Sequence, residues 1–216
     1  MESNVKFKNL SPFNHLSFLS KKTIILLVSF LFILLSFQLV YAAFGPSGSE
    51  WKVNTFTTNW QLEPSVAMDS DGDFVVAWAS ENQDFSGYGV YGQRYSSDGT
   101  TQGAEWKVNT VTSSNQWDPS VAMDSDGDFV VTWEGNQNGG DIYGQRYSSN
   151  GTTQGAEWKV NTETTDDQMD PSVAMDSDGD FVVTWASNEQ DGLGYGVYGQ
   201  RYSSDGTTQG AEWKVN

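Results

Sequence analysis

The sequence predicts an all-β protein made of tandem four-stranded antiparallel sheets that resemble propeller blades, and three observations lead to this fold class. The stretch PSVAMDSDGDFVVAW occurs three times with one position varied, at 64–78, 119–133 and 171–185. The stretch EWKVN occurs four times, at 50–54, 105–109, 157–161 and 212–216. Between them, YGQRY and a Ser-Ser-Asp-Gly or Ser-Ser-Asn-Gly turn also recur. Periods of about 50 residues are typical of modular β architectures with about four strands in each unit.

The segment 64–78 predicts a β-hairpin, because two apolar runs flank a turn-rich Asp-Ser-Asp-Gly-Asp. A two-residue loop at 71–72 would place Met68 opposite Val75, whereas a three-residue loop at 70–72 places it opposite Phe74. We favour the longer loop because small Ala67 and Ala77 then share one face with Val75. The opposite face then collects the bulky side chains, which are Val66, Met68, Phe74, Val76 and Trp78. A bulky face and a small face suit sheets that stack on one another.

Four strands complete each unit, in the order PSVAM, FVVAW or FVVTW, YGQRY and EWKVN. This predicts three β repeats within 50–216, at 64–109, 119–161 and 171–216, and leaves an extra leading strand at 50–54. Three blades are too few to close a propeller, which typically has 4–8. We therefore expect an incomplete ring of three units, whose open sheet edge pairs with other copies of the chain or with further repeats.

An N-terminal hydrophobic helix is predicted at 1–43, either as a signal peptide or as a membrane anchor. Lys21 and Lys22 precede an uncharged apolar run at 23–40, and small residues near Ala42 permit cleavage. Uncleaved, the same run is long enough to span a bilayer, so membrane contact is expected only through 23–40. Residues 44–49 read as a linker. Both alternatives predict a secreted or cell-surface location for the repeats.

Composition excludes several classes of function. The chain has no Cys and a single His, His15, so disulfides, thiol nucleophiles and Cys-ligated zinc are excluded, and the repeats contain no imidazole. Four of the 11 basic residues and one of the 28 acidic residues precede residue 43, which leaves 7 positive and 27 negative charges in the rest. Such a surface repels nucleic acid and anionic lipid, so neither is an expected partner.

The stretches DSDGDFVVTW and GQRYSSDGTTQGAEWKVNT resemble the tandem repeats of large secreted bacterial and archaeal surface proteins. The resemblance covers 50–216. It implies a propeller-like β architecture and an extracellular setting, often beside calcium-binding or adhesin-type modules. It assigns no activity, and this chain differs in having three units and no recognisable partner module.

The Asp-rich loops are candidates for calcium binding, since alternate carboxylates in a loop suit a hard cation. The candidate ligands are Asp69, Asp71, Asp73, Asp124, Asp126, Asp128, Asp176, Asp178 and Asp180. Phe74 stands where a helix-loop-helix calcium loop requires Gly, so that type of site is excluded. The alternative is a β-turn in which Asp and Gly serve backbone geometry.

Ligand contacts are expected where the repeats differ, because loops on a uniform scaffold are common binding sites. Unlike aromatic residues gather in 55–63, in its copies and in the loop at 79–90, and the candidates are Trp60, Trp117, Phe85 and Tyr88. Such side chains could stack on sugar rings, or they could cap the edges of the blades.

We predict no catalytic residues, because every candidate acid in the repeated blocks occurs in triplicate, whereas catalytic sites usually break repeat symmetry. The favoured function is a non-enzymatic extracellular or cell-surface repeat module for interaction or envelope structure. The alternatives are a carbohydrate-binding, lectin-like β-propeller and, third, a glycan-cleaving enzyme.

Overall fold

The computed structural model describes residues 48–136 and 139–216, which contain β-strands joined by turns and loops. The predicted signal or anchor at 1–43 lies outside the described residues. Within those ranges no helix has the length and apolar character needed to cross a membrane. All strands belong to one compact unit, 52–216.

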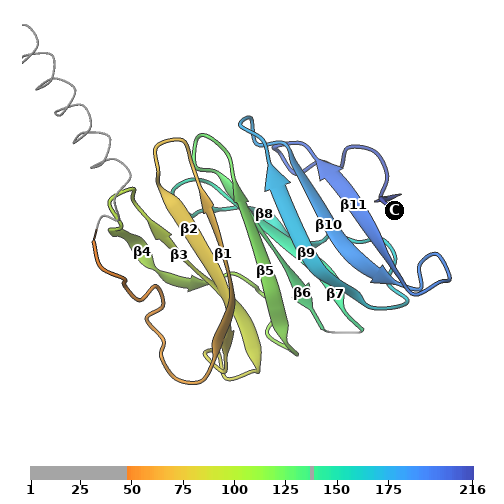
Figure 1. The fold of residues 1–216 in the computed structure, drawn as a ribbon, viewed down its shortest axis with the longest axis horizontal. Helices are drawn as coiled ribbons and strands as arrows, with labels where there is room; N and C mark the ends of the chain where they lie inside the picture. Colours follow the sequence, from red (N-terminus) through yellow and green to blue (C-terminus); the bar gives the residue numbers. More distant parts are fainter. Residues whose placement is uncertain (1–47, 137–138) are drawn as a thin grey trace, which may run out of the picture. The chain divides into compact units, whose positions relative to one another are not determined.

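Three antiparallel four-stranded sheets, here called blades 1 to 3, follow one another along the chain (Figure 1). Blade 1 contains β1 (Gln61–Met68), β2 (Phe74–Glu81), β3 (Tyr88–Tyr95) and β4 (Thr101–Lys107). Blade 2 contains β5 (Gln116–Met123), β6 (Phe129–Gly135), β7 (Asp141–Tyr147) and β8 (Thr153–Lys159). Blade 3 contains β9 (Gln168–Met175), β10 (Phe181–Asn188), β11 (Tyr195–Tyr202) and β12 (Trp213–Lys214). In each blade the strands pair in chain order, and the first strands β1, β5 and β9 lie side by side (Figure 1). The predicted fold class is confirmed.

The hairpin register is the one that the longer loop predicts. Met68 pairs with Phe74 and Val66 with Val76, and the equivalent pairs recur in the other two blades. The Asp69 amide donates to the Asp73 carbonyl at 2.9 Å, and Gly72 adopts a φ of +89°. Only a glycine takes this left-handed conformation without strain, which explains its place in the turn.

The first strand of each blade begins three residues earlier than predicted. Gln61, Gln116 and Gln168 open β1, β5 and β9, and a β-bulge follows them. The Gln116 side chain is buried and donates through Nε2 to the carbonyls of Ser113 and Ser114, each at 3.0 Å. A buried amide therefore holds the preceding loop against the strand, a role that the hydrophobic pattern does not reveal.

The structure forms no strand at 50–54, where the sequence predicted an extra leading strand. In the other copies the Trp and Lys of EWKVN lie in the last strand of the blade, which pairs with the YGQRY strand before it, as β4 pairs with β3. The described residues before 50–54, which are 48–49, contain no YGQRY-type strand with which such a ladder could form. Val53 instead packs beside the core of blade 1, and its carbonyl accepts a hydrogen bond from the Tyr95 hydroxyl at 2.8 Å.

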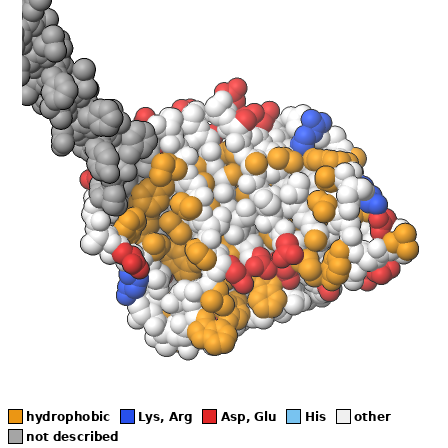
Figure 2. Space-filling model, viewed as in Figure 1, with side chains coloured by type: hydrophobic (Ala, Val, Ile, Leu, Met, Phe, Trp, Pro, Cys, Tyr) orange, Lys and Arg blue, Asp and Glu red, His pale blue; other side chains and the backbone are white. Residues whose placement is uncertain are grey.

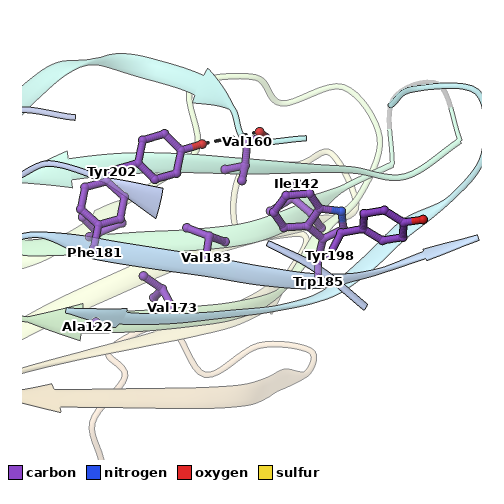
Figure 3. Close-up of a cluster of buried hydrophobic side chains, with 10 residues drawn as sticks. Ala122, Ile142, Val160, Val173, Phe181, Val183, Trp185, Tyr198 and Tyr202 are labelled. Atoms are coloured by element: carbon purple, nitrogen blue, oxygen red, sulfur yellow. Dashed lines mark hydrogen bonds between the residues drawn. The ribbon is translucent and has the colours of Figure 1, made fainter. Parts of the chain in front are cut away.

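The hydrophobic core lies between the blades, as stacked sheets require. Figure 3 shows the junction of blades 2 and 3, where Ala122, Ile142 and Val160 meet the large side chains of blade 3. Trp185 and Phe181 are almost completely buried there, and Phe181 stacks on Tyr202 with ring centroids 4.7 Å apart. The junction of blades 1 and 2 repeats this arrangement with Trp133, Phe129 and Tyr147.

Candidate interaction surfaces

Each junction between blades is fastened by the same set of polar contacts. The Ser65 hydroxyl accepts a hydrogen bond from the Val121 amide at 3.1 Å, and Ser120 accepts from Val173 at the same distance. These bonds join the first strands of neighbouring blades. Every junction thus uses one serine from the earlier blade and one backbone amide from the later blade.

A second contact joins the Asp-rich turns of successive blades. The Ser70 hydroxyl donates to the Ser125 carbonyl at 3.0 Å, and the Ser125 hydroxyl donates to the Ser177 carbonyl at 2.9 Å. Nearby, the guanidinium of Arg94 donates to the Ser149 carbonyl, and that of Arg146 donates to the Asp205 carbonyl. Each contact reaches from one blade to the next blade along the chain.

The two end faces expose several of the positions that internal junctions bury. Val66 is 62% exposed, whereas its equivalent Val121 in blade 2 is 6% exposed. On blade 3, Val215 is 54% exposed, whereas its equivalent Val108 in blade 1 is 3% exposed. We call the side of blade 1 with Leu62, Val66 and Met68 the leading face, and the side of blade 3 with Ala174, Val182, Val197 and Val215 the trailing face. Apolar side chains that are exposed on an end face, at positions that are buried in the internal junctions, are typical of an interaction surface.

The four predicted aromatic ligand residues fall into two pairs. Tyr88 and Trp117 pack together across the junction of blades 1 and 2, with ring centroids 6.1 Å apart. Trp60 and Phe85 are 66% and 94% exposed. They lie at the same end of blade 1, since the Glu81 amide donates to the Trp60 carbonyl at 2.8 Å and the Phe85 amide donates to Asn82 at 3.2 Å. The structure therefore leaves Trp60 and Phe85 as the pair open to a ligand.

The Asp-rich loops use their carboxylates to shape the turns. Asp69 accepts hydrogen bonds from the amides of Asp71 and Asp73, each at 2.9 Å, and the copies repeat this pattern. Asp73 accepts from the Ser97 amide and from Gln102. The described residues contain no group of three carboxylates or imidazoles that could hold a metal ion. The geometry thus agrees with the β-turn alternative and gives calcium binding no support.

A row of acidic residues crosses the first strands of the three blades. Glu63, Asp118 and Asp170, each followed by Pro and Ser, line an open hollow of about 330 Å³. Figure 2 shows acidic side chains in a row on the face that carries these strands. Burial and the nearby charge of Glu63 raise the pKa of Asp118 to about 6. All three residues adopt a positive φ, between 47° and 54°, at the bulge.

Glu134 is a residue that the sequence reasoning missed. It replaces Ala79 of blade 1 and Ala186 of blade 3, and it is only 9% exposed on β6. Burial raises its pKa to about 7, and the negative charges of Asp118 and Asp170 add to the effect. The sequence feature that could have revealed it is the acidic residue in an apolar strand at a position where the other two repeats have alanine.

Comparison with known proteins identifies no family for this chain. No protein-family model matches the sequence, and no curated protein matches it either. Among solved structures, the chain is similar to the endo-arabinase from Bacteroides thetaiotaomicron VPI-5482, with 17% identity, a TM-score of 0.46, and coverage of 68% of this chain and 58% of that one.

Two further solved structures are similar to the chain. An alpha-L-arabinofuranosidase from Lactobacillus brevis shows 11% identity and a TM-score of 0.48, with coverage of 73% of this chain and 57% of that one. The Hadza microbial sialidase Hz136 shows 13% identity and a TM-score of 0.50, with coverage of 68% and 36%. The chain thus spans less than two thirds of the length of these three proteins. At these identities the likeness concerns the fold alone, and the chain is an all-β protein of three tandem four-stranded antiparallel sheets that resemble propeller blades.

Proposed function

We propose that this chain is a non-enzymatic module of an exported or cell-surface protein, and that it acts by binding blades of its own type. The observation that carries the proposal is the contrast between equivalent positions, such as Val66 at 62% exposure and Val121 at 6%. Removing a side chain of this size from water contributes about 1.5–3 kcal/mol, so several such positions supply a driving force for association.

Charge substitutions on the two faces test the proposal. Val66→Asp on the leading face and Val215→Asp on the trailing face should each reduce the mass of the assembly, measured by sedimentation of the full chain in mild detergent. Phe85→Asp is the matched control, because Phe85 is equally apolar and 94% exposed beside an intact junction. A monomeric wild-type chain, or equal effects of all three variants, would refute the proposal.

Carbohydrate binding is the second candidate, and the exposed pair Trp60 and Phe85 favours it. Aromatic rings that remain exposed at one end of a blade are available to stack on sugar faces. Binding to a glycan array that is lost with Trp60→Ala, and retained by the folded Trp117→Ala variant, would support this function. Trp117 is the control because it packs against Tyr88 between blades.

Glycan cleavage is the third candidate, and Glu134 is the observation that favours it. Glycosidases use two carboxyl groups, one of which has a raised pKa. Glu134, with a pKa of about 7, lies close enough to Asp118 for the two charges to interact. Hydrolysis of a glycan by the wild-type chain, abolished by Glu134→Gln, would support this activity.

A further inference from the structure

We propose that the partner of each open face is a second copy of this chain, bound head to tail, so that the trailing face of one copy packs on the leading face of the next. This inference rests on the proposed function and names the occupant of the two faces. The internal junctions are the template for this contact, because the blades are near-identical in sequence. In each internal junction, the trailing side of one blade already packs on the leading side of the next.

Unused hydrogen-bonding groups match across such a contact. Ser172 is the blade 3 equivalent of Ser65 and Ser120, and it is exposed, with no hydrogen bond to a later blade. The Val66 amide of the next copy stands where Val121 and Val173 stand in the internal junctions. A hydrogen bond from Val66 to Ser172 would extend the same series between copies.

Arg201 provides a second match. Its equivalents Arg94 and Arg146 both donate to a carbonyl in the Ser-Ser turn of the following blade. Arg201 is exposed, and the following blade in a neighbouring copy is blade 1, whose equivalent turn is 96–99. The guanidinium of Arg201 is therefore placed to donate to that turn.

The aromatic contact between blades 1 and 2 also has an equivalent pair of positions on the two end faces. Tyr88 of blade 1 packs on Trp117 of blade 2. The corresponding residues of the open faces are Tyr195, which is 57% exposed, and Leu62, which is 40% exposed. Head-to-tail packing would bring this tyrosine and this leucine together and remove both from water.

One segment must move for the copies to dock. Val53 and Val215 belong to identical EWKVN stretches, and Val53 occupies the place on blade 1 that Val108 occupies on blade 2, beside a tyrosine hydroxyl. The Val215 carbonyl of a neighbouring copy would take over the bond from Tyr95. Residues 50–54, which belong to no sheet, are then displaced.

Symmetry distinguishes this contact from other associations. A head-to-tail interface is heterologous, so two leading faces do not meet each other. The same operation produces either a closed ring or an open row of copies, depending on the rotation at each contact.

Cysteine cross-linking tests the proposal, because the chain contains no cysteine of its own. The Ser70 hydroxyl contacts blade 2 and the Ser125 hydroxyl contacts Ser177, so Ser177 of one copy should lie beside Ser70 of the next. Full-length Ser70→Cys and Ser177→Cys variants with different tags are mixed and treated with a short bifunctional thiol reagent. A cross-linked heterodimer in the mixture, and no homodimer with either variant alone, is the expected result.

Internal controls make each outcome decisive. Ser125→Cys combined with Ser177→Cys in one chain should cross-link within the molecule, which calibrates the reagent. Adding Val66→Asp to the Ser70→Cys variant should abolish the heterodimer. Homodimers of Ser70→Cys alone, or no heterodimer while the internal control reacts, would overturn the head-to-tail contact. If sedimentation then still shows association that depends on Val66, the proposed function stands with a different partner. A monomer in both experiments refutes both.

Discussion

Replacing Glu134 by glutamine should make the protein more stable at neutral and alkaline pH. Glu134 is 9% exposed, and its burial, together with the charges of Asp118 and Asp170, opposes ionisation of its carboxyl group. Blades 1 and 3 carry Ala79 and Ala186 at this position, so the strand itself does not require a charge. Glutamine keeps the size of the side chain and removes the titration.

The sign of the pH dependence follows from the raised pKa. Between the unfolded value of 4.5 and the folded value of about 7, the folded chain holds more protons than the unfolded chain. The free energy of unfolding therefore falls as the pH rises through this window, and it is unaffected by Glu134 below 4.5. A shift from 4.5 to about 7 is equivalent to at most about 3–4 kcal/mol. Solvent around the neighbouring carboxylates reduces this to about 1–2 kcal/mol.

Urea unfolding followed by tryptophan fluorescence measures this effect. At about pH 8 the Glu134→Gln variant should exceed the wild type by about 1–2 kcal/mol, and at about pH 5 the difference should be much smaller. Glu163→Gln is the control, because hydrogen bonds from the exposed 164–165 turn lower the pKa of Glu163, and its loss should not stabilise the protein at high pH. A Glu134→Gln variant that is less stable than the wild type at pH 8, or equally shifted at both pH values, would refute the reasoning.

Three further outcomes are expected. Asp98→Asn should weaken the loss of stability in acid, because hydrogen bonds from Ser96 and Thr100 hold the pKa of Asp98 at about 2. The ionised carboxylate stabilises the folded chain above pH 3.8, and this contribution is lost as the pH falls toward 2, which an acid titration of unfolding measures. Asparagine is tolerated at this turn position, since Asn150 fills it in blade 2. Trp133→Ala should cost about 3–5 kcal/mol in urea unfolding, because the side chain is fully buried, and a cost below about 1 kcal/mol would contradict this packing. Gly144→Ala should lower the free energy of unfolding by about 1–3 kcal/mol, since a Cβ would lie 2.7 Å from the Trp158 ring. Gly199→Ala should lower it less, because Trp213 is exposed and can shift. Equal losses of thermal stability in the two variants would contradict this difference.

The local pattern of the chain determined the hairpins. Alternating apolar residues and the Ser-Asp-Gly loop fixed the pairing of Met68 with Phe74, because the turn type sets the register and the side-chain period is two. The same rules identified the four strands of each blade. They failed where each blade begins, because a β-bulge extends the first strand beyond its apolar part and, at Gln116 and Gln168, the side-chain amide is buried.

The candidate site was only partly predictable. The aromatic set was named from its departures from the repeat, but the sequence did not separate Trp60, which is exposed, from Trp117, which packs on Tyr88. Glu134 was overlooked because its significance depends on burial and on carboxylates from two other strands. Such distances exist only once the blades are stacked.

Identical stretches in different blades show what the sequence determines and what the tertiary structure determines. The sequence by itself determined that Val66 and Val121 lie at the same place in the same hairpin, and that each repeat ends in a fourth strand, predicted at EWKVN and found at Thr101–Lys107 in blade 1. Only the tertiary structure decided that Val121 is buried while Val66 is exposed, and that the fourth strand of blade 3 shortens to Trp213–Lys214. The physical reason is that local sequence is the same in every copy, whereas burial depends on whether another sheet lies against that face.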